Sequence, residues 1–156
     1  MLKSLGFAAA VLFVATPAQA GPAEDATAAV VNWLDRFNAG DIAAFNAGHA
    51  PGAVIVDEFP PFVWSGAKSS EAWLNDYGKD AAANGITGGR VDYAAATRAE
   101  SDGRSAYVVL PTVYRFKQGG KAMSAAGSMT FVMTRTNAGW KIASWTYSAP
   151  EPKAER

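Results

Sequence analysis

The chain has 156 residues, with 14 basic and 14 acidic side chains, one histidine and no cysteine. This balance of charge lacks the basic surface that nucleic-acid binding requires, so we expect no nucleic-acid partner. The lack of cysteine excludes a disulfide framework and thiol chemistry, and stability must therefore come from a packed core. The length fits one domain.

Residues 1–20 have the pattern of a secretory signal peptide. A basic start at Lys3 precedes an apolar run from Leu5 to Ala15, and Ala18 to Ala20 then form an A-x-A cleavage site. The run of about 11 residues is shorter than the about 20 that a membrane-spanning helix needs. We therefore expect cleavage after Ala20 and a periplasmic or secreted mature protein that has no membrane partner.

Three amphipathic helices are predicted in the first half of the mature chain. Asp25–Asn38 carries apolar side chains three and four residues apart, which is the spacing of one buried helical stripe. Asp41 is placed to cap a second, short helix whose inner face extends to His49. A third helix is expected over Ser70–Ala83, where Asn84 and Gly85 follow as a stop signal.

The second half of the chain has the alternation and turn residues of a β-sheet. A short strand at 53–57 precedes a loop with two prolines, which exclude a central strand there. Longer strands separated by glycine-containing turns predict an antiparallel meander, within a single domain at 21–149. We expect a frayed polar tail at 150–156. The longer strands are predicted at 90–100, 104–117, 121–136 and 140–148.

Helices that cover one face of a curved antiparallel sheet form an α+β fold, which can enclose a ligand cavity. On the strand from Lys121, Thr130 points to one face while Met129, Phe131 and Met133 point to the other. We expect the Thr130 face to look at the helices. The methionine face would then lie outside, as the interface of a homodimer or under the tail or a loop.

The segment Phe37–Phe45, a short strand that ends in Asp57 and the final Gly139–Trp145 carry a resemblance to a known group. They resemble the nuclear-transport-factor-two-like superfamily, which includes ketosteroid isomerases and SnoaL-like, polyketide-cyclase-like proteins. The likeness covers nearly the whole mature chain. It implies a cystatin-like α+β barrel, in which a cone-shaped sheet packs on about three N-terminal helices around an apolar pocket.

The resemblance also implies a catalytic role for Asp57. In the isomerases, a carboxylate at the end of the first strand moves a proton next to a carbonyl, and a tyrosine and a protonated aspartic acid hold the oxyanion. The positions that correspond to these two donors are Trp33 and Thr130, which do not reproduce the acidic pair. Steroid isomerisation is therefore disfavoured. Alternatively, Asp57 only ends its strand, with its carboxylate in water.

His49 is a second candidate acid or base, because an unperturbed histidine titrates at a pKa of about 6.5. The alternative is a packing residue at the end of a helix. A single histidine without a neighbouring cluster of acidic residues does not provide a metal site, so we expect neither a metal nor a cofactor.

The aromatic residues are too numerous for a surface, and most are expected in the core. A subset is predicted to line one chamber with few charges, which is the composition of a small-molecule site. We expect it to bind a small hydrophobic molecule without established chemistry. The alternatives are a cofactor-free isomerase, cyclase or dehydratase with Asp57 as base, and an interaction domain whose cavity is filled by its own aromatics. The predicted lining is Trp33, Phe59, Trp64, Tyr77, Tyr114, Thr130, Trp145 and Tyr147.

Overall fold

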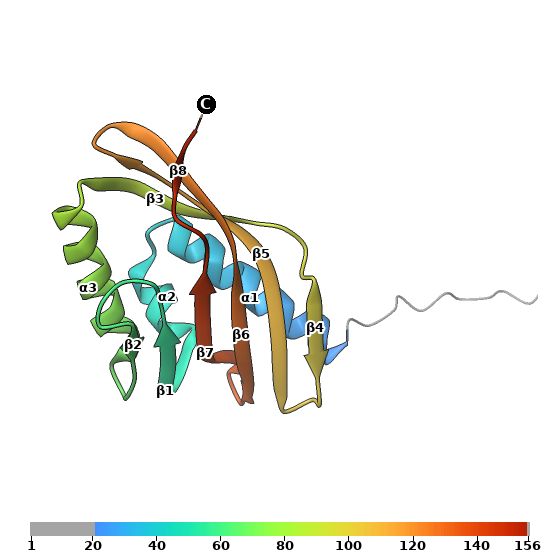
Figure 1. Cartoon of the computed structure of the whole chain (residues 1–156). Helices are drawn as coiled ribbons and strands as arrows, with labels where there is room; N and C mark the ends of the chain where they lie inside the picture. Colours follow the sequence, from blue (N-terminus) through green and yellow to red (C-terminus); the bar gives the residue numbers. More distant parts are fainter. Residues whose placement is uncertain (1–20, 156) are drawn as a thin grey trace, which may run out of the picture.

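The computed structural model describes residues 21–155, which form an α+β fold with three helices packed on a curved, unclosed sheet (Figure 1). This confirms the predicted fold class. The predicted signal peptide lies outside the described residues. The helices are α1 (Pro22–Asn38), α2 (Ile42–Ala47) and α3 (Ser69–Ala83). The strands are β1 (His49–Val56), β2 (Val63–Trp64), β3 (Ile86–Tyr93), β4 (Arg98–Ser101), β5 (Ser105–Gln118), β6 (Lys121–Thr136), β7 (Gly139–Ser148) and β8 (Lys153–Ala154).

The helices follow the predicted periodicity. The apolar stripe of α1 is buried against the sheet, with Val30 and Leu34 fully inaccessible to solvent. The Asp41 carboxylate accepts a hydrogen bond from the Ala44 backbone N–H at 3.0 Å, as expected of a helix N-cap. One position needs correction: α2 ends at Ala47, and His49 is the first residue of β1 instead of part of the helix. No helix within residues 21–155 has the length and apolar character to cross a membrane.

The sheet has the strand order β2-β1-β7-β6-β5-β3, while β4 also pairs with β5 and β8 with β6. All of these pairs are antiparallel except β1 with β7, which run parallel. The parallel pair was not predicted, because an antiparallel meander explains only strands that follow one another in the chain. It places β1 beside the last long strand, so that Val56 is opposite Thr146.

The predicted strand at 90–100 is divided in the structure. The pairing of β3 with β5 shifts between Thr87 and Arg90, and Gly88 lies there at a φ of +64°. A left-handed glycine at a bulge bends a strand and increases its twist. After Tyr93 the chain leaves the sheet and returns as β4 on the same neighbour, so this edge curves instead of continuing straight.

The orientation predicted for β6 is wrong by one residue. Phe131 is opposite Trp145 and Met129 is opposite Tyr147, and directly opposed residues share a face of the sheet. Met129, Phe131 and Met133 are therefore core residues, each at most 4% exposed, whereas Thr130 lies on the outer face. The methionine face cannot be a dimer interface. A register shift between Val132 and Met133 marks an irregularity in the pairing of β6 with β7.

The C-terminal tail is attached to the sheet and not frayed. Lys153 and Ala154 form β8 against Ser124 and Met123, and the Glu155 backbone N–H donates to the Ala122 carbonyl at 2.9 Å. The polar composition of the tail did not reveal this pairing, since backbone hydrogen bonds need no particular side chain. The tail therefore crosses the sheet at the end where β5 turns into β6 (Figure 1). The residues next to β8 are thereby brought toward the interior.

This register generates a stability prediction for two adjacent residues. Phe131→Ala should lower the free energy of unfolding by about 3–5 kcal/mol, because it leaves a cavity in the core. Thr130→Ala, on the outer face, should lower it by less than about 1 kcal/mol. Urea unfolding measures both values, and a larger loss for Thr130→Ala would contradict the register.

Candidate functional site

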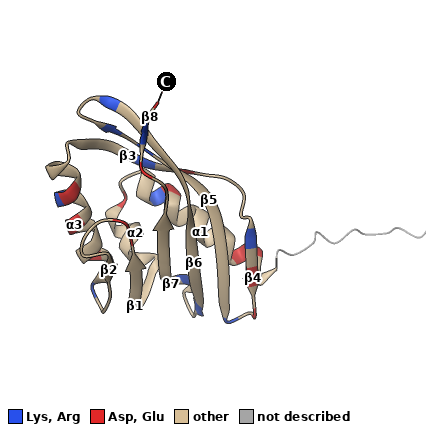
Figure 2. Ribbon diagram, viewed as in Figure 1, with Lys and Arg blue, Asp and Glu red and all other residues tan. Residues whose placement is uncertain are grey.

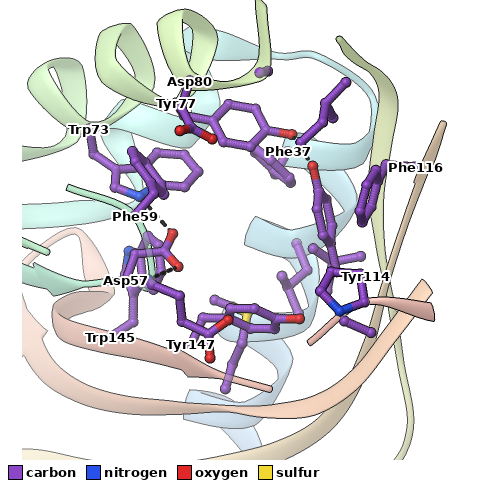
Figure 3. A pocket seen from close by; sticks show the side chains of 18 of the residues that line it. Phe37, Asp57, Phe59, Trp73, Tyr77, Asp80, Tyr114, Phe116, Trp145 and Tyr147 are labelled. Atoms are coloured by element: carbon purple, nitrogen blue, oxygen red, sulfur yellow. Dashed lines mark hydrogen bonds between the residues drawn. The ribbon is translucent and has the colours of Figure 1, made fainter. Parts of the chain in front are cut away.

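A cavity of about 200 Å³ lies between the helices and the inner face of the sheet, and its walls are mostly aromatic and apolar (Figure 3). Side chains from α1, α3, the loop after β1, and strands β3, β5, β6 and β7 line it, together with Pro152 of the tail. An apolar cavity of about 150 Å³ holds benzene. The space therefore fits a molecule of one or two rings.

The structure brings most of the predicted site residues to this cavity. Asp57 and Phe59 come from the loop after β1, and α1, α3, β5 and β7 each add at least one aromatic ring (Figure 3). The predicted residues on these other elements are Trp33 on α1, Tyr77 on α3, Tyr114 on β5, and Trp145 and Tyr147 on β7.

Two of the predicted lining residues lie elsewhere. Thr130 points away from the cavity, as its register requires. Trp64 is buried behind the wall, where its ring packs on Phe59 with centroids 4.9 Å apart. Its indole Nε1–H donates to Asp76 Oδ2 at 3.0 Å, so this side chain links β2 to α3 and leaves no group for a ligand.

The Asp57 carboxylate lies at the cavity wall with both oxygens hydrogen-bonded. Trp73 Nε1–H donates to Oδ2 at 2.9 Å, and the Glu58 backbone N–H donates to Oδ1 at 2.8 Å (Figure 3). Burial in these apolar surroundings raises the pKa of Asp57 to about 6, and the nearby charges of Glu58 and Asp80 add to the rise. The two hydrogen bonds act in the opposite direction but are outweighed. A carboxylate with this pKa is ionised at neutral pH and can also return a proton.

Three tyrosine hydroxyls lie around the same cavity. Those of Tyr77 and Tyr114 are hydrogen-bonded to each other at 2.8 Å. The Tyr147 hydroxyl is buried and has no hydrogen-bond partner among residues 21–155. Burial raises the pKa of both Tyr114 and Tyr147, so their hydroxyls remain protonated at neutral pH. Tyr147 therefore carries an unused hydrogen-bond donor beside the cavity, and its oxygen is enclosed by neighbouring protein atoms.

The indole N–H of Trp33 is not available as an oxyanion donor, because it donates to the Phe45 carbonyl at 3.1 Å. His49 contacts that same carbonyl through Nδ1 at 3.0 Å, and its Nε2 lies 3.1 Å from Trp145 Nε1. Since the indole can only donate, His49 Nε2 is the acceptor and Nδ1 carries the hydrogen. Burial lowers the pKa of His49 to about 4, which keeps the ring neutral. His49 thus connects α2 to β7, and its proposed acid–base role is not supported.

Several residues of the site were missed by the sequence analysis. Trp73 falls within the predicted third helix, but its hydrogen bond to Asp57 was not predicted, because its partner lies 16 residues earlier in the chain. Asp80 and Pro152 line the cavity from a helix and from a tail that was expected to be frayed. Within residues 21–155, no group of three or more histidine or acidic side chains is arranged to hold a metal ion.

The raised pKa of Asp57 predicts how stability depends on pH. From about pH 4 to pH 6 the folded state retains a proton that the unfolded state has lost, so the native protein becomes less stable as pH rises. Relative to Asp57→Asn, which cannot titrate, the wild type should lose up to about 3 kcal/mol between pH 4 and pH 7. Urea unfolding of both proteins across this range measures the difference.

The control for this experiment is Glu71→Gln, which removes an exposed carboxylate near the start of α3. Its stability relative to the wild type should change little with pH. A difference between wild type and Asp57→Asn that stays constant within about 0.5 kcal/mol would contradict a buried, titrating Asp57.

Comparison with solved structures gives the same fold. A ketosteroid isomerase-like protein from Erwinia carotovora atroseptica superimposes with a TM-score of 0.68 at 21% identity, covering 83% of this chain and 97% of that one. A putative scytalone dehydratase from Novosphingobium aromaticivorans has a TM-score of 0.67 at 8% identity, with 85% and 86% covered. A hexachlorocyclohexane dehydrochlorinase, LinA type 2, has a TM-score of 0.65 at 11% identity, with 85% and 87% covered.

At these identities the solved structures show the fold alone, and no curated protein matches the chain. The sequence profile of the SnoaL-like domain matches residues 26–152, which includes α1 from Ala26 onward, α2, α3, β1 to β7 and the cavity residues from Trp33 to Pro152. The chain therefore belongs to the SnoaL-like domain family.

Proposed function

We propose that the protein binds a small, mostly apolar molecule of one or two rings, and that Asp57 acts on it as a general base. The observation that carries this proposal is a carboxylate with a pKa of about 6 in the wall of an aromatic cavity. Groups of this kind are enriched at catalytic sites, because the ideal pKa of a general base lies near the working pH. No cofactor is needed for such a proton transfer.

The reaction class follows from what these side chains can do. The Asp57 carboxylate takes a proton from an acidic carbon of the bound molecule, and the C–H electron pair remains on the molecule. That pair either moves to a neighbouring carbonyl oxygen, which gives an enolate that becomes an isomer when the proton returns to a different carbon, or it expels a leaving group with its bonding electrons, which gives an elimination. The Tyr147 hydroxyl is the available donor for the atom that gains charge. Asp57 then returns its proton or loses it to water.

Two observations argue against a steroid as the substrate. The cavity of about 200 Å³ has room for one or two rings. The indole of Trp33 is already hydrogen-bonded within the protein, so the oxyanion arrangement of the steroid isomerases is not reproduced. Two structurally similar proteins are named as a putative dehydratase and a dehydrochlorinase. Loss of water and loss of hydrogen chloride are both elimination reactions. We therefore favour elimination or isomerisation of a compact ring compound.

Base catalysis can be tested before the natural substrate is known. The probe is 5-nitrobenzisoxazole, a neutral two-ring compound that opens to a coloured phenolate when a base removes its ring C–H proton. Wild-type protein should accelerate the opening, with a rate that rises with pH and is half-maximal near pH 6. Asp57→Asn should reduce the rate by about 100- to 10,000-fold, because it keeps the shape but removes the base.

Glu71→Gln should leave the rate of ring opening unchanged, because this carboxylate is exposed and lies outside the cavity. A purely binding protein would give a different result. In that case Asp57→Asn would change the affinity for the probe, while the rate would equal that of free acetate at the same concentration of carboxylate. That outcome would leave binding without chemistry as the function.

We also propose a homodimer through the outer face of the sheet. Val54, Ser144, Val132 and Tyr107 form a row across four adjacent strands, and its three large side chains are exposed. Charged residues lie mainly on the helices, on β4 and at strand ends, so the middle of this face is uncharged (Figure 2). An exposed apolar patch of this kind marks an interface, and under a two-fold axis the same patch of two copies would meet.

Light scattering tests the dimer. Wild-type protein should have twice the chain mass at micromolar concentration, with an interface of about 1,600 Å² in total. Val132→Glu places a charge in the middle of the face and should give a monomer. A wild-type monomer at about 100 μM would contradict this interface.

We further propose export, and intact-mass analysis of periplasmic product should show a chain that begins at Gly21.

A further inference from the structure

The charged residues of the cavity are all acidic. Asp57, Glu58 and Asp80 are among its lining residues, while lysine, arginine and histidine are absent from the lining formed by residues 21–155. Neither Glu58 nor Asp80 forms a salt bridge with another described residue. Glu58 is exposed and Asp80 is partly exposed, so both lie where the cavity meets solvent. A molecule that enters the cavity therefore encounters uncompensated negative charge.

The tyrosines around the cavity respond to this charge. Burial raises the pKa of Tyr77, and the carboxylates of Asp57 and Asp80 raise it further. Burial likewise raises the pKa of Tyr147, with additional contributions from Glu58 and Asp57. Asp57 thus acts on a tyrosine of each of two facing walls, and the space where a ligand would lie is between them.

The aromatic walls act in the same direction. The faces of tryptophan and tyrosine rings carry negative charge density, which attracts a cation and repels an anion. Rings of this kind among the residues that line the cavity are Trp33, Trp73, Tyr77, Tyr114, Trp145 and Tyr147. Proton abstraction also leaves one negative charge shared between base and substrate, so an anionic substrate would add a second charge with no cation to balance it.

We propose that the cavity accepts neutral or cationic ring compounds and rejects anionic ones, and that Glu58 and Asp80 are the specificity-determining residues. This inference rests on the proposed function only in taking the cavity as the binding site. It limits the substrate class: carboxylates, sulfates and phosphate esters are excluded, whereas ketones, alcohols, halides and amines are admitted. Acidic residues at the entrance of the cavity repel anionic ligands. The apolar contacts inside the cavity do not have to distinguish one ring compound from another.

The test uses three probes with the same ring system and different charge. They are 2-naphthylmethanol, which is neutral, 2-naphthylmethylamine, which is a cation at neutral pH, and 2-naphthoate, which is an anion. Binding is followed by NMR through the indole N–H resonances of Trp73 and Trp145, which lie in the cavity wall. The ionic strength is kept at about 0.15 M, because screening changes the result.

For the wild type, the Kd of 2-naphthoate should be at least about tenfold higher than that of the alcohol, and the amine should bind at least as tightly as the alcohol. In the double variant Glu58→Gln, Asp80→Asn, the Kd of 2-naphthoate should come within about threefold of the alcohol. The amide oxygens can still accept the hydrogen bonds that the Ala149 backbone N–H and the Asn84 side chain donate to these positions. The variant thus removes charge and keeps shape.

The matched control is Glu71→Gln, Glu100→Gln, which removes two exposed carboxylates outside the cavity and should keep the tenfold gap. Equal binding of all three probes to the wild type would overturn charge selection alone and leave the binding pocket intact. A gap that persists in the Glu58→Gln, Asp80→Asn variant would overturn the role of these residues. Failure of all three probes to bind would overturn both this inference and the proposed function.

Discussion

The site depends on one constraint, which is that the Asp57 carboxylate must remain charged inside an aromatic cavity. Burial raises the pKa of this group and so favours its protonated form. The N–H groups of Trp73 and Glu58 stabilise the ionised form and limit the pKa to about 6. The result is a base that is ionised at pH 7 and yet stronger than a carboxylate in water.

The fold meets this constraint through the parallel pairing of β1 and β7. In this register Val56 lies opposite Thr146. Asp57 and Tyr147 are the next residues of the two segments, and both segments run in the same direction. The base and the unpartnered tyrosine hydroxyl therefore share one side of the cavity, while α3 brings Trp73 to the other carboxylate oxygen. The bulges that curve the sheet leave space between these groups and the helices.

The sequence was informative where local periodicity decides the structure, and less so where pairing between distant segments does. The stripe of α1, the cap at Asp41 and the long hairpins follow from neighbours in the chain. The side of β6 on which Thr130 lies depends on a choice between two alternating faces, both rich in hydrophobic or β-branched residues, and a one-residue error exchanges them. The Trp73–Asp57 contact and the pairing of β8 have no local signal, because both depend on how the chain returns to itself.

The proposed chemistry depends most directly on the ionisation of the Asp57 side chain. Carboxyl carbon NMR of selectively labelled protein, compared with Asp57→Asn to assign the resonance, follows the titration of Asp57 between about pH 3 and pH 8. The account predicts a midpoint near pH 6, with the Trp73 indole N–H resonance shifting over the same range. A midpoint at or below about 3.9 would show a carboxylate in ordinary contact with water and would contradict a buried general base at this position.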